Sequence, residues 1–516
     1  MTAMVRHITG ASSTSHQTWQ TIQWNQANTE VKQLQMRIAK AIREKSYGKA
    51  KALQWLLTHS FSAKALAVKR VMTNSGAKTP GVDGVVWKKP EEKMQAVYSL
   101  QRRGYKPQPL RRIYIPKKQK GSFRPLSIPC LIDRSMQTLH LQALEPVMET
   151  MVDKNAYGFR PKRSCADAIE QCFIALARKN CASFVLEGDI RACFDSLSGK
   201  WLEDNIITDK ITLSKWLTAG YMEEKVKHPT YDGVPQGGSI SAALLVLALK
   251  GLEETVKNAT SRKDKVNVIV YADDFVVTGS TKEVLENKVM PVVVTFLKER
   301  GLELSVEKTK ITHVDEGFDF LGFNIRKYNS KLLIKPSKAN IKVFLDNIRV
   351  LIKSHATIKT EDLIRLLNPK IRGWANYYRH VVSKATFNYV DHHIFKAIMQ
   401  WVNRRHPEKN ATWSKKKYFR VQGMRQWTFS VAMKNKKGRK TFLDLFEAAR
   451  LPICRHIKIR AEANPYDPKY TEYFLKRESL KNKLRIFDQI FFNLKLKCQE
   501  TTQLNSRVIF NGLWKA

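Results

Sequence analysis

Two neighbouring aspartates, Asp273 and Asp274, interrupt an apolar stretch that reads VIVYADDFVVTG over residues 268–279. The β-branched runs on either side predict two strands, and the few residues between them leave room only for a tight hairpin turn. Neighbouring carboxylates repel each other, and apolar surroundings make it costly to keep both ionised. A pair of acids placed in this way indicates that a cation is held there.

A third aspartate, Asp189, lies at the end of another apolar run, VLEGDIRACFDSL at residues 185–197. An aspartate in such a position can also be a helix N-cap or a turn residue. Together with Asp273 and Asp274 at the end of a second strand of the same sheet, it would offer oxygen ligands to a pair of Mg²⁺ ions, with Mn²⁺ as a substitute. Two such metals activate an attacking hydroxyl and stabilise a leaving pyrophosphate, which is the chemistry of nucleotidyl transfer.

Two other segments have residues suited to holding a nucleotide. Residues 110–129 predict a strand, a turn with Lys and Gly, and a second strand carrying Arg124, a hairpin that could clamp a triphosphate or simply be a solvated basic hairpin. Residues 233–241 read GVPQGGSIS, in which the glycines let the backbone approach a ligand and Gln236 offers an amide. The alternative for this second segment is a plain turn before an apolar helix.

The elements that must position these residues follow from the hydrophobic periodicity. Residues 28–71 predict two or three helices, and residues 111–325 alternate strand-like with helical runs, as in a mixed α/β domain. Helical periodicity dominates residues 338–404, whereas residues 411–440 are aromatic and basic with short strand-like runs. Residues 317–323, GFDFLGF, predict a hairpin that closes the catalytic domain.

The charge balance points to a polyanionic partner. The 516 residues include 90 basic and 46 acidic side chains, a formal net charge of +44, and the apolar content of 43% is enough for a real core. Nucleic acid is the commonest polyanion that such a surface binds. Residues 155–169, NAYGFRPKRSCADAI, combine basic side chains with two aromatics and suit the grip of a template strand. The longest apolar run, residues 240–249, is about half a membrane span, so we expect no membrane partner.

The cysteines and the N-terminus indicate the compartment. The seven cysteines lie far apart with no Cys-x-x-Cys pair, which indicates neither a disulfide scaffold nor a zinc ribbon. The N-terminus has no apolar signal segment, so we expect a reducing, soluble compartment rather than secretion.

In their order and spacing, these motifs resemble the reverse transcriptases encoded by group II introns, also called intron maturases. The matching motifs are Tyr-Ala-Asp-Asp at 271–274, Asp-Ile-Arg-Ala-Cys-Phe-Asp at 189–195, Ile-Pro-Lys-Lys at 115–118, Arg-Pro-Leu at 124–126, Gly-Phe-Arg-Pro at 158–161, Pro-Gln-Gly-Gly at 235–238 and Phe-Asp-Phe-Leu-Gly-Phe at 318–323. Residues 367–378, 401–407 and 413–419 are similar to the family's thumb, the maturase X domain. The resemblance covers residues 20–477.

The resemblance implies a role for each matching residue. Asp189, Asp273 and Asp274 would be the catalytic metal ligands, assisted by the backbone carbonyl of Ile190. The implied nucleotide contacts are Lys117 and Arg124 as the triphosphate clamp, Phe194 as the gate under the deoxyribose, Gln236 in the nucleotide pocket and Lys308 as a nearby cation. Phe194 could instead be an ordinary core residue, and Lys308 an ordinary surface lysine. The side chains expected to contact RNA or DNA are Arg160, Arg163, Arg404, Arg405, Lys415, Lys416 and Lys417.

The fold implied by the resemblance is a right-hand polymerase of the α/β (α+β) class. The expected regions are a helical N-terminal extension at 1–72, reverse transcriptase fingers and palm with an antiparallel sheet at 73–330, a helical thumb or maturase X domain at 331–412, a basic DNA-binding region at 413–459, and a truncated HNH endonuclease remnant at 460–516. The Cys pairs and His-rich cluster of the family's endonuclease are missing, and only Cys498 occurs there. We therefore expect no zinc and no endonuclease activity.

The implied function is an RNA-directed DNA polymerase that binds its group II intron RNA, assists splicing and copies the intron into DNA during retrohoming. Its partners would be the intron RNA, an RNA template with a DNA primer, target DNA and deoxynucleoside triphosphates (dNTPs), in a bacterial cytoplasm or an organellar matrix or stroma. Two alternatives are a splicing-only RNA-binding maturase and a reverse transcriptase recruited to host defence or repair. The intact aspartates argue against the splicing-only protein, while the oligomeric state stays open.

Overall fold

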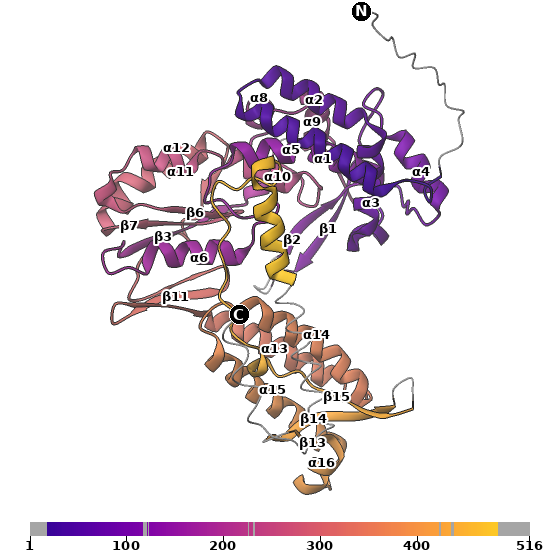
Figure 1. Cartoon of the computed structure of the whole chain (residues 1–516), viewed down its shortest axis with the longest axis vertical. Helices are drawn as coiled ribbons and strands as arrows, with labels where there is room; N and C mark the ends of the chain where they lie inside the picture. Colours follow the sequence, from indigo (N-terminus) through magenta and orange to yellow (C-terminus); the bar gives the residue numbers. More distant parts are fainter. Residues whose placement is uncertain are drawn as a thin grey trace, which may run out of the picture.

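The computed structural model of the chain describes residues 18–116, 121, 123–224, 226–230, 233–422, 425–434 and 438–482 (Figure 1). Helices and mainly antiparallel sheets are combined in it, which confirms the expected mixed class. An upper body carries the N-terminal helices and the sheets that contain β1 (Leu110–Pro116), β3 (Phe184–Arg191) and β11 (Phe323–Tyr328), and a lower body carries a helical bundle (Figure 1). None of the helices in the described ranges is both long and apolar enough to cross a membrane.

The N-terminal part is a helical layer around one buried helix. The helices are α1 (Trp24–Arg43), α2 (Tyr47–His59), α3 (Phe61–Thr73), α4 (Pro90–Ser99) and α5 (Leu131–Met151), with the short turn η1 (Ser75–Lys78). The first three confirm the helices predicted for residues 28–71. Helix α5 is buried along most of its length, and several of its polar side chains bond to neighbouring segments. Gln142, for example, donates to the carbonyl of Ala63 at 3.0 Å.

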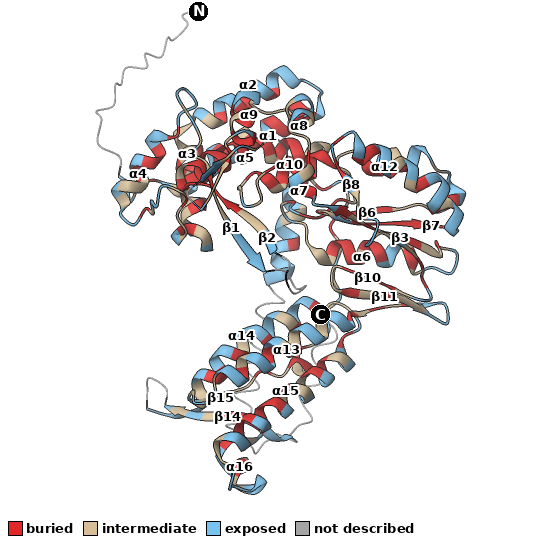
Figure 2. Cartoon of the chain, turned by 180° about the vertical axis from the view of Figure 1, so that it is seen from behind, coloured by how far each residue is buried: buried red, intermediate tan, exposed pale blue. Residues whose placement is uncertain are grey.

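A four-stranded sheet, which we call the fingers sheet, follows this layer. Its strands are β1 (Leu110–Pro116), β2 (Phe123–Ile128), β4 (Tyr221–Glu223) and β5 (Val226–His228), in the order β2-β1-β4-β5. Strands β1 and β2 form the predicted hairpin, with Ile115 opposite Arg124. The outer half of this hairpin is exposed to solvent (Figure 2).

The palm sheet is the five-stranded sheet that carries the aspartates. It consists of β3 (Phe184–Arg191), β6 (Val268–Tyr271), β7 (Asp274–Gly279), β8 (Glu303–Leu304) and β9 (Lys310–His313), in the order β6-β7-β3-β8 with β9 also on β3. Side chains alternate between two cores: Leu186 and Val277 belong to the core shared with α5, while Val185 and Val276 belong to the core shared with α6 and the thumb. Both faces of the sheet are therefore covered.

The remaining helices of the upper body are short. The helices are α6 (Cys165–Leu176), α7 (Cys193–Ser196), α8 (Gly199–Asn205), α9 (Lys210–Leu217), α10 (Ser241–Ala248), α11 (Leu252–Asn258) and α12 (Met290–Lys298), with the 3-10 turn η2 (Arg262–Asp264) and the π-helical stretch η3 (Val284–Val289) before α12. Helix α10 confirms the apolar helix expected after the Gly-Gly pair.

The lower body is the thumb. Helices α13 (Lys338–Ser354), α14 (Thr360–Tyr378) and α15 (Lys384–Arg405) form the bundle, and the sheet β10 (Phe318–Phe320), β11 (Phe323–Tyr328) and β12 (Lys331–Pro336) connects it to the palm. The predicted hairpin at 317–323 is thus confirmed as β10 and β11. At the far end lie α16 (Ala411–Tyr418) and the sheet β13 (Phe419–Gln422), β14 (Arg425–Lys434) and β15 (Lys440–Asp444).

The chain then returns from the thumb to the upper body, and we call residues 445–482 the C-terminal segment. It contains η4 (Ala448–Arg450), η5 (Pro468–Tyr470) and a helical stretch at 471–482, drawn in yellow in Figure 1. Tyr466 donates to Glu145 of α5 at 2.8 Å, and Arg43 of α1 pairs with Asp467. Residues 460–482, which were assigned to an endonuclease remnant, thus pack on the polymerase; Cys498 and the rest of that region lie outside the described residues.

Candidate active site

The three aspartates meet because of the pairing between β3 and β7. Asp189 lies directly opposite Asp274, and Asp274 lies directly opposite Tyr271 of β6. Side chains of directly opposed residues in an antiparallel sheet project to the same face. Asp189, Asp274 and Tyr271 therefore form a row across one face of the palm sheet, with Asp273 in the turn beside them. This confirms the expectation that the acids share one end of one sheet.

The turn that carries Asp273 is held in an unusual backbone conformation. Ala272 has φ +59°, a left-handed value that costs a non-glycine residue about 1–2 kcal/mol. Residues 155–158 brace the turn from below. Tyr157 donates its N–H to the carbonyl of Val270 at 2.9 Å, and a Cβ added to Gly158 would come within 2.2 Å of the Ala272 nitrogen. Only glycine at position 158 lets the two backbones approach this closely.

One lysine partly neutralises the carboxylates. Lys308 Nζ lies 2.8 Å from Asp189 Oδ2, and this hydrogen bond raises the pKa of the Lys308 ammonium. Partial desolvation, followed by the charges of Asp273 and Asp189, raises the pKa of Asp274 to about 6, while Lys308 acts in the opposite sense. Lys308 is thus placed in the palm as predicted, and the site keeps an excess of negative charge.

This excess suits a divalent cation that is shared with a substrate. Among the described residues, no three Asp, Glu, His or Cys side chains converge closely enough to enclose a metal ion on their own. Mg²⁺ is usually held by one or two carboxylates together with substrate phosphates and water rather than by a closed protein cage. Carboxylates that crowd together at an open edge of the sheet, with the pKa of Asp274 raised, fit that mode of binding.

The loop at 233–238 joins the elements that were expected to hold the nucleotide. Val234 donates to the carbonyl of Phe194 at 2.6 Å, and the carbonyl of Gln236 accepts from Ser127 of β2 at 2.7 Å. Phe194 is half-buried in α7 and contacts the main core. The loop therefore ties α7 to the β1–β2 hairpin that carries Arg124.

The other residues predicted to contact the nucleotide differ in their exposure to solvent. Arg124 is exposed on β2, and Ile190 buries its side chain, so only its main chain can face the acids. Lys117 lies outside the described residues.

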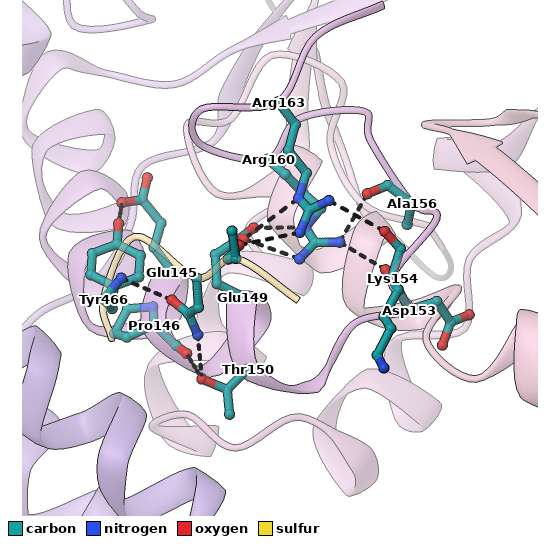
Figure 3. A network of polar contacts seen from close by, with 12 residues as sticks. Glu145, Pro146, Glu149, Thr150, Asp153, Lys154, Ala156, Arg160, Arg163 and Tyr466 are labelled. Carbon is teal, nitrogen blue, oxygen red and sulfur yellow. Dashed lines mark hydrogen bonds and ion pairs between the residues drawn. The ribbon is translucent and has the colours of Figure 1, made fainter. Parts of the chain in front are cut away.

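Arg160, predicted to contact a template, is a structural residue instead. Its side chain is 1% exposed, and Nε and Nη2 donate to Glu149 of α5 at 2.7 and 3.0 Å (Figure 3). Nη1 donates to the carbonyls of Asp153 and Ala156, each at 2.8 Å. The prediction was wrong because the motif alone does not reveal a buried carboxylate on another helix.

Arg163 is likewise wrongly assigned to the template. Its side chain is 2% exposed and Nε lies 3.8 Å from Glu149 (Figure 3). Its guanidinium donates to the carbonyls of Lys154 at 3.3 Å and Ala461 at 3.1 Å. Arg163 thus connects α5, the loop at 154 and the C-terminal segment.

The two aromatics of the same motif have different environments. Tyr157 is 1% exposed and belongs to the core, so it cannot stack on a template as expected. Phe159 is 55% exposed and has φ +55°, a rare conformation for a bulky residue. Strain held at an exposed aromatic is typical of functional sites, and the sequence gives no signal for it.

The basic residues predicted for RNA contact in the thumb are only partly exposed. Arg404, Lys416 and Lys417 are exposed. Arg405 donates to the carbonyl of Ile358 at 2.5 Å, and Lys415 donates to Gln426 at 2.9 Å. These last two side chains also stabilise the thumb itself.

The raised pKa of Asp274 predicts a pH-dependent cost of folding. The pKa of Asp274 in the folded protein lies above the ordinary value, so protonation of this carboxyl stabilises the folded state. This stabilisation is complete at low pH and is lost as the pH rises through about 6. Asp274→Asn should therefore melt at a higher temperature than the unmodified protein at pH 7.5 in a chelator, with the difference shrinking towards pH 5. Differential scanning calorimetry measures this.

Asp204→Asn is the matched control, because Asp204 is an exposed carboxylate on α8. If the melting temperature rose equally in both variants, or rose by the same amount at pH 7.5 and pH 5, the result would contradict repulsion between crowded carboxylates.

Known protein families match three parts of the chain. Residues 19–100 match the N-terminal domain of reverse transcriptase, residues 115–325 match reverse transcriptase (RNA-dependent DNA polymerase), and residues 341–419 match the group II intron maturase-specific domain. The third match coincides with the thumb and α16.

Individual relatives agree with these families. Protein YkfC of Escherichia coli is 32% identical over 314 residues, which are 52% of this chain and 81% of that protein. Group II intron-encoded protein LtrA of Lactococcus lactis is 27% identical over 483 residues, covering 74% of this chain and 79% of LtrA. A telomerase structure from Candida albicans aligns over 60% of this chain and 64% of that chain with a TM-score of 0.35 and 12% identity, a weak likeness. This chain belongs to the group II intron-encoded reverse transcriptases and maturases, and it is an RNA-directed DNA polymerase with a right-hand fold.

Proposed function

We propose that the chain copies a group II intron RNA into DNA at a target site and also assists the splicing of that RNA. The row formed by Asp189, Asp274 and the adjacent Asp273 carries this proposal, because it places acids with excess negative charge at the edge of a sheet. The maturase-specific match at 341–419 supports the splicing role. The setting would be a bacterial cytoplasm or an organellar matrix.

Asp189, Asp273 and Asp274 would hold two Mg²⁺ ions, for which Mn²⁺ can substitute, with the main chain of Ile190 beside them. When bound, such ions lower the pKa of an attacking primer hydroxyl and neutralise charge on a triphosphate. The chain's own residues arrange the reactants around them. Lys308, 2.8 Å from Asp189, offsets part of the carboxylate charge and orients that side chain.

The nucleotide would lie between α7, the loop at 233–238 and the β1–β2 hairpin. Arg124 and Lys117 would bind its phosphates, and Gln236 would line its pocket. Phe194 would pack under the sugar, where an aromatic ring leaves no room for a 2′-hydroxyl. The hydrogen bond from Val234 to the Phe194 carbonyl fixes the backbone of this residue and supports such a role.

The thumb would bind RNA through the exposed side chains of Arg404, Lys416 and Lys417. Phosphate contacts of this kind bind without reading sequence and weaken as salt rises.

Asp273→Ala should separate the two activities. It removes a proposed metal ligand, so extension of a DNA primer on an RNA template should fall by orders of magnitude. It also removes a negative charge beside a polyanion, so affinity for a group II intron transcript should hold or rise slightly. Both are measured on the same preparations, with primer extension and filter binding.

Asp204→Ala on α8 is the control and should leave both activities unchanged. If Asp273→Ala loses RNA affinity as severely as extension, the two functions are not separable. If the unmodified protein fails to extend the primer, the proposed polymerase function is wrong.

Phe194→Val tests the choice of sugar. Because the change removes a steric barrier and no ligand, ribonucleotides should be incorporated while deoxynucleotide incorporation is largely kept. Primer extension with each nucleotide set measures the ratio. Phe173→Val, an exposed phenylalanine on α6, is the matched control. Unchanged discrimination in Phe194→Val would assign Phe194 to the core.

A further inference from the structure

A groove lies beside the aspartates, between the palm, the end of α14 and the C-terminal segment. It has a volume of about 780 Å³. Tyr271 and the start of α6 line one side, and residues 376–380 of the thumb line the second. The third side is made by Cys454–Ile457 and by the helical stretch at 471–482. We call this cavity the C-terminal groove.

The C-terminal groove begins next to the row of acids. Tyr271 lies opposite Asp274, which lies opposite Asp189, so the three occupy adjacent strands on one face of the sheet. Adjacent strands are about 4.8 Å apart, which places the groove roughly 10 Å from Asp189 along the palm. Tyr271 thus connects the row of acids to the lining of the groove.

The lining of the groove suits nucleic acid. It contains three tyrosines, Tyr271, Tyr377 and Tyr473, and no acidic side chain. Its basic side chains include Arg455, Lys476 and Lys481, which are exposed. Aromatic rings stack on bases or sugars irrespective of sequence, and lysines pair with phosphates.

The wall formed by the C-terminal segment is firmly anchored. Asp167 of α6, whose side chain is fully buried, accepts from the Ile459 N–H at 2.7 Å and from Arg477 at 2.9 Å. His456 Nε2 lies 2.8 Å from the same carboxylate oxygen. Arg477 thus holds the helical stretch to the palm. Its neighbour Lys476 is exposed at the groove, where its ammonium lies 2.7 Å from Glu472 in a solvent-exposed ion pair that a phosphate can replace.

We propose that the C-terminal groove binds one strand of the RNA–DNA hybrid as it leaves the aspartates, and that Arg455, Tyr473, Lys476 and Lys481 contribute to this binding. The proposal rests on the polymerase function proposed above. In this proposal, residues 460–482, which the sequence assigns to an endonuclease remnant, bind nucleic acid for the polymerase. A volume of this size accommodates a single strand rather than a whole duplex, so the other strand would lie towards the thumb.

The test compares the full chain with Lys476→Ala/Lys481→Ala in binding an RNA template annealed to a DNA primer, without nucleotides, over a range of salt. Loss of two phosphate contacts should weaken binding roughly tenfold and reduce the slope of log Kd against log salt by about two. Lys476→Arg/Lys481→Arg keeps both charges and should bind as the unmodified chain does.

The matched control is Lys263→Ala/Lys298→Ala. Both lysines are exposed and lie away from the groove. Lys298 is on α12, which packs on the opposite face of the palm sheet, and Lys263 is in η2, shortly before β6 begins at the end away from Tyr271. This variant should bind the hybrid with nearly the slope and affinity of the unmodified chain.

An unchanged affinity and slope in Lys476→Ala/Lys481→Ala would overturn the proposal. Tighter binding would overturn it too, because the C-terminal segment would then obstruct the palm. Primer extension by the unmodified chain is scored separately: its failure would refute the polymerase function, whereas hybrid binding alone decides the role of the groove.

Discussion

The site depends on the register between β3 and β7. A shift of one residue would turn Asp189 to the other face of the sheet, away from Asp274, because side chains alternate with a period of two. The register is fixed at the neighbouring pair, where Gly188 lies opposite Phe275. A Cβ on Gly188 would come within 2.2 Å of the Phe275 ring, so the ring can lie there only over a glycine. Burial of both sheet faces reinforces the same pairing.

Bringing acids together has an electrostatic and a conformational cost, and the surrounding structure offsets both. Lys308 compensates part of the charge, and the backbone at Gly158 supports the left-handed Ala272. Glu149, Arg160 and Arg163 then hold the supporting loop through a buried network that reaches the C-terminal segment. A chain of contacts thus connects the helical core, the catalytic turn and the last described helix.

The elements that depend on local sequence pattern could be predicted from the sequence. The strands around Asp189 and Asp274, the β1–β2 hairpin and the thumb helices follow from periodicity and turn residues. Predictions failed where a residue distant in the sequence determines the environment. The sequence around Arg160 is typical of an exposed arginine, but in the fold its side chain is buried in an ion pair with Glu149 of α5. The C-terminal groove could not be predicted either, because its lining comes from five separate segments spread between residues 163 and 481, and packing between such segments leaves no periodic signal.

The most direct test of the account is whether the paired aspartates bind a divalent cation. Electron paramagnetic resonance can follow the binding of Mn²⁺ to the full chain in the presence of a dNTP, and to Asp189→Asn/Asp274→Asn under the same conditions. The account predicts bound Mn²⁺ in the unmodified chain that Mg²⁺ displaces, and loss of that population in the double variant. Equal Mn²⁺ binding by the two proteins would contradict it.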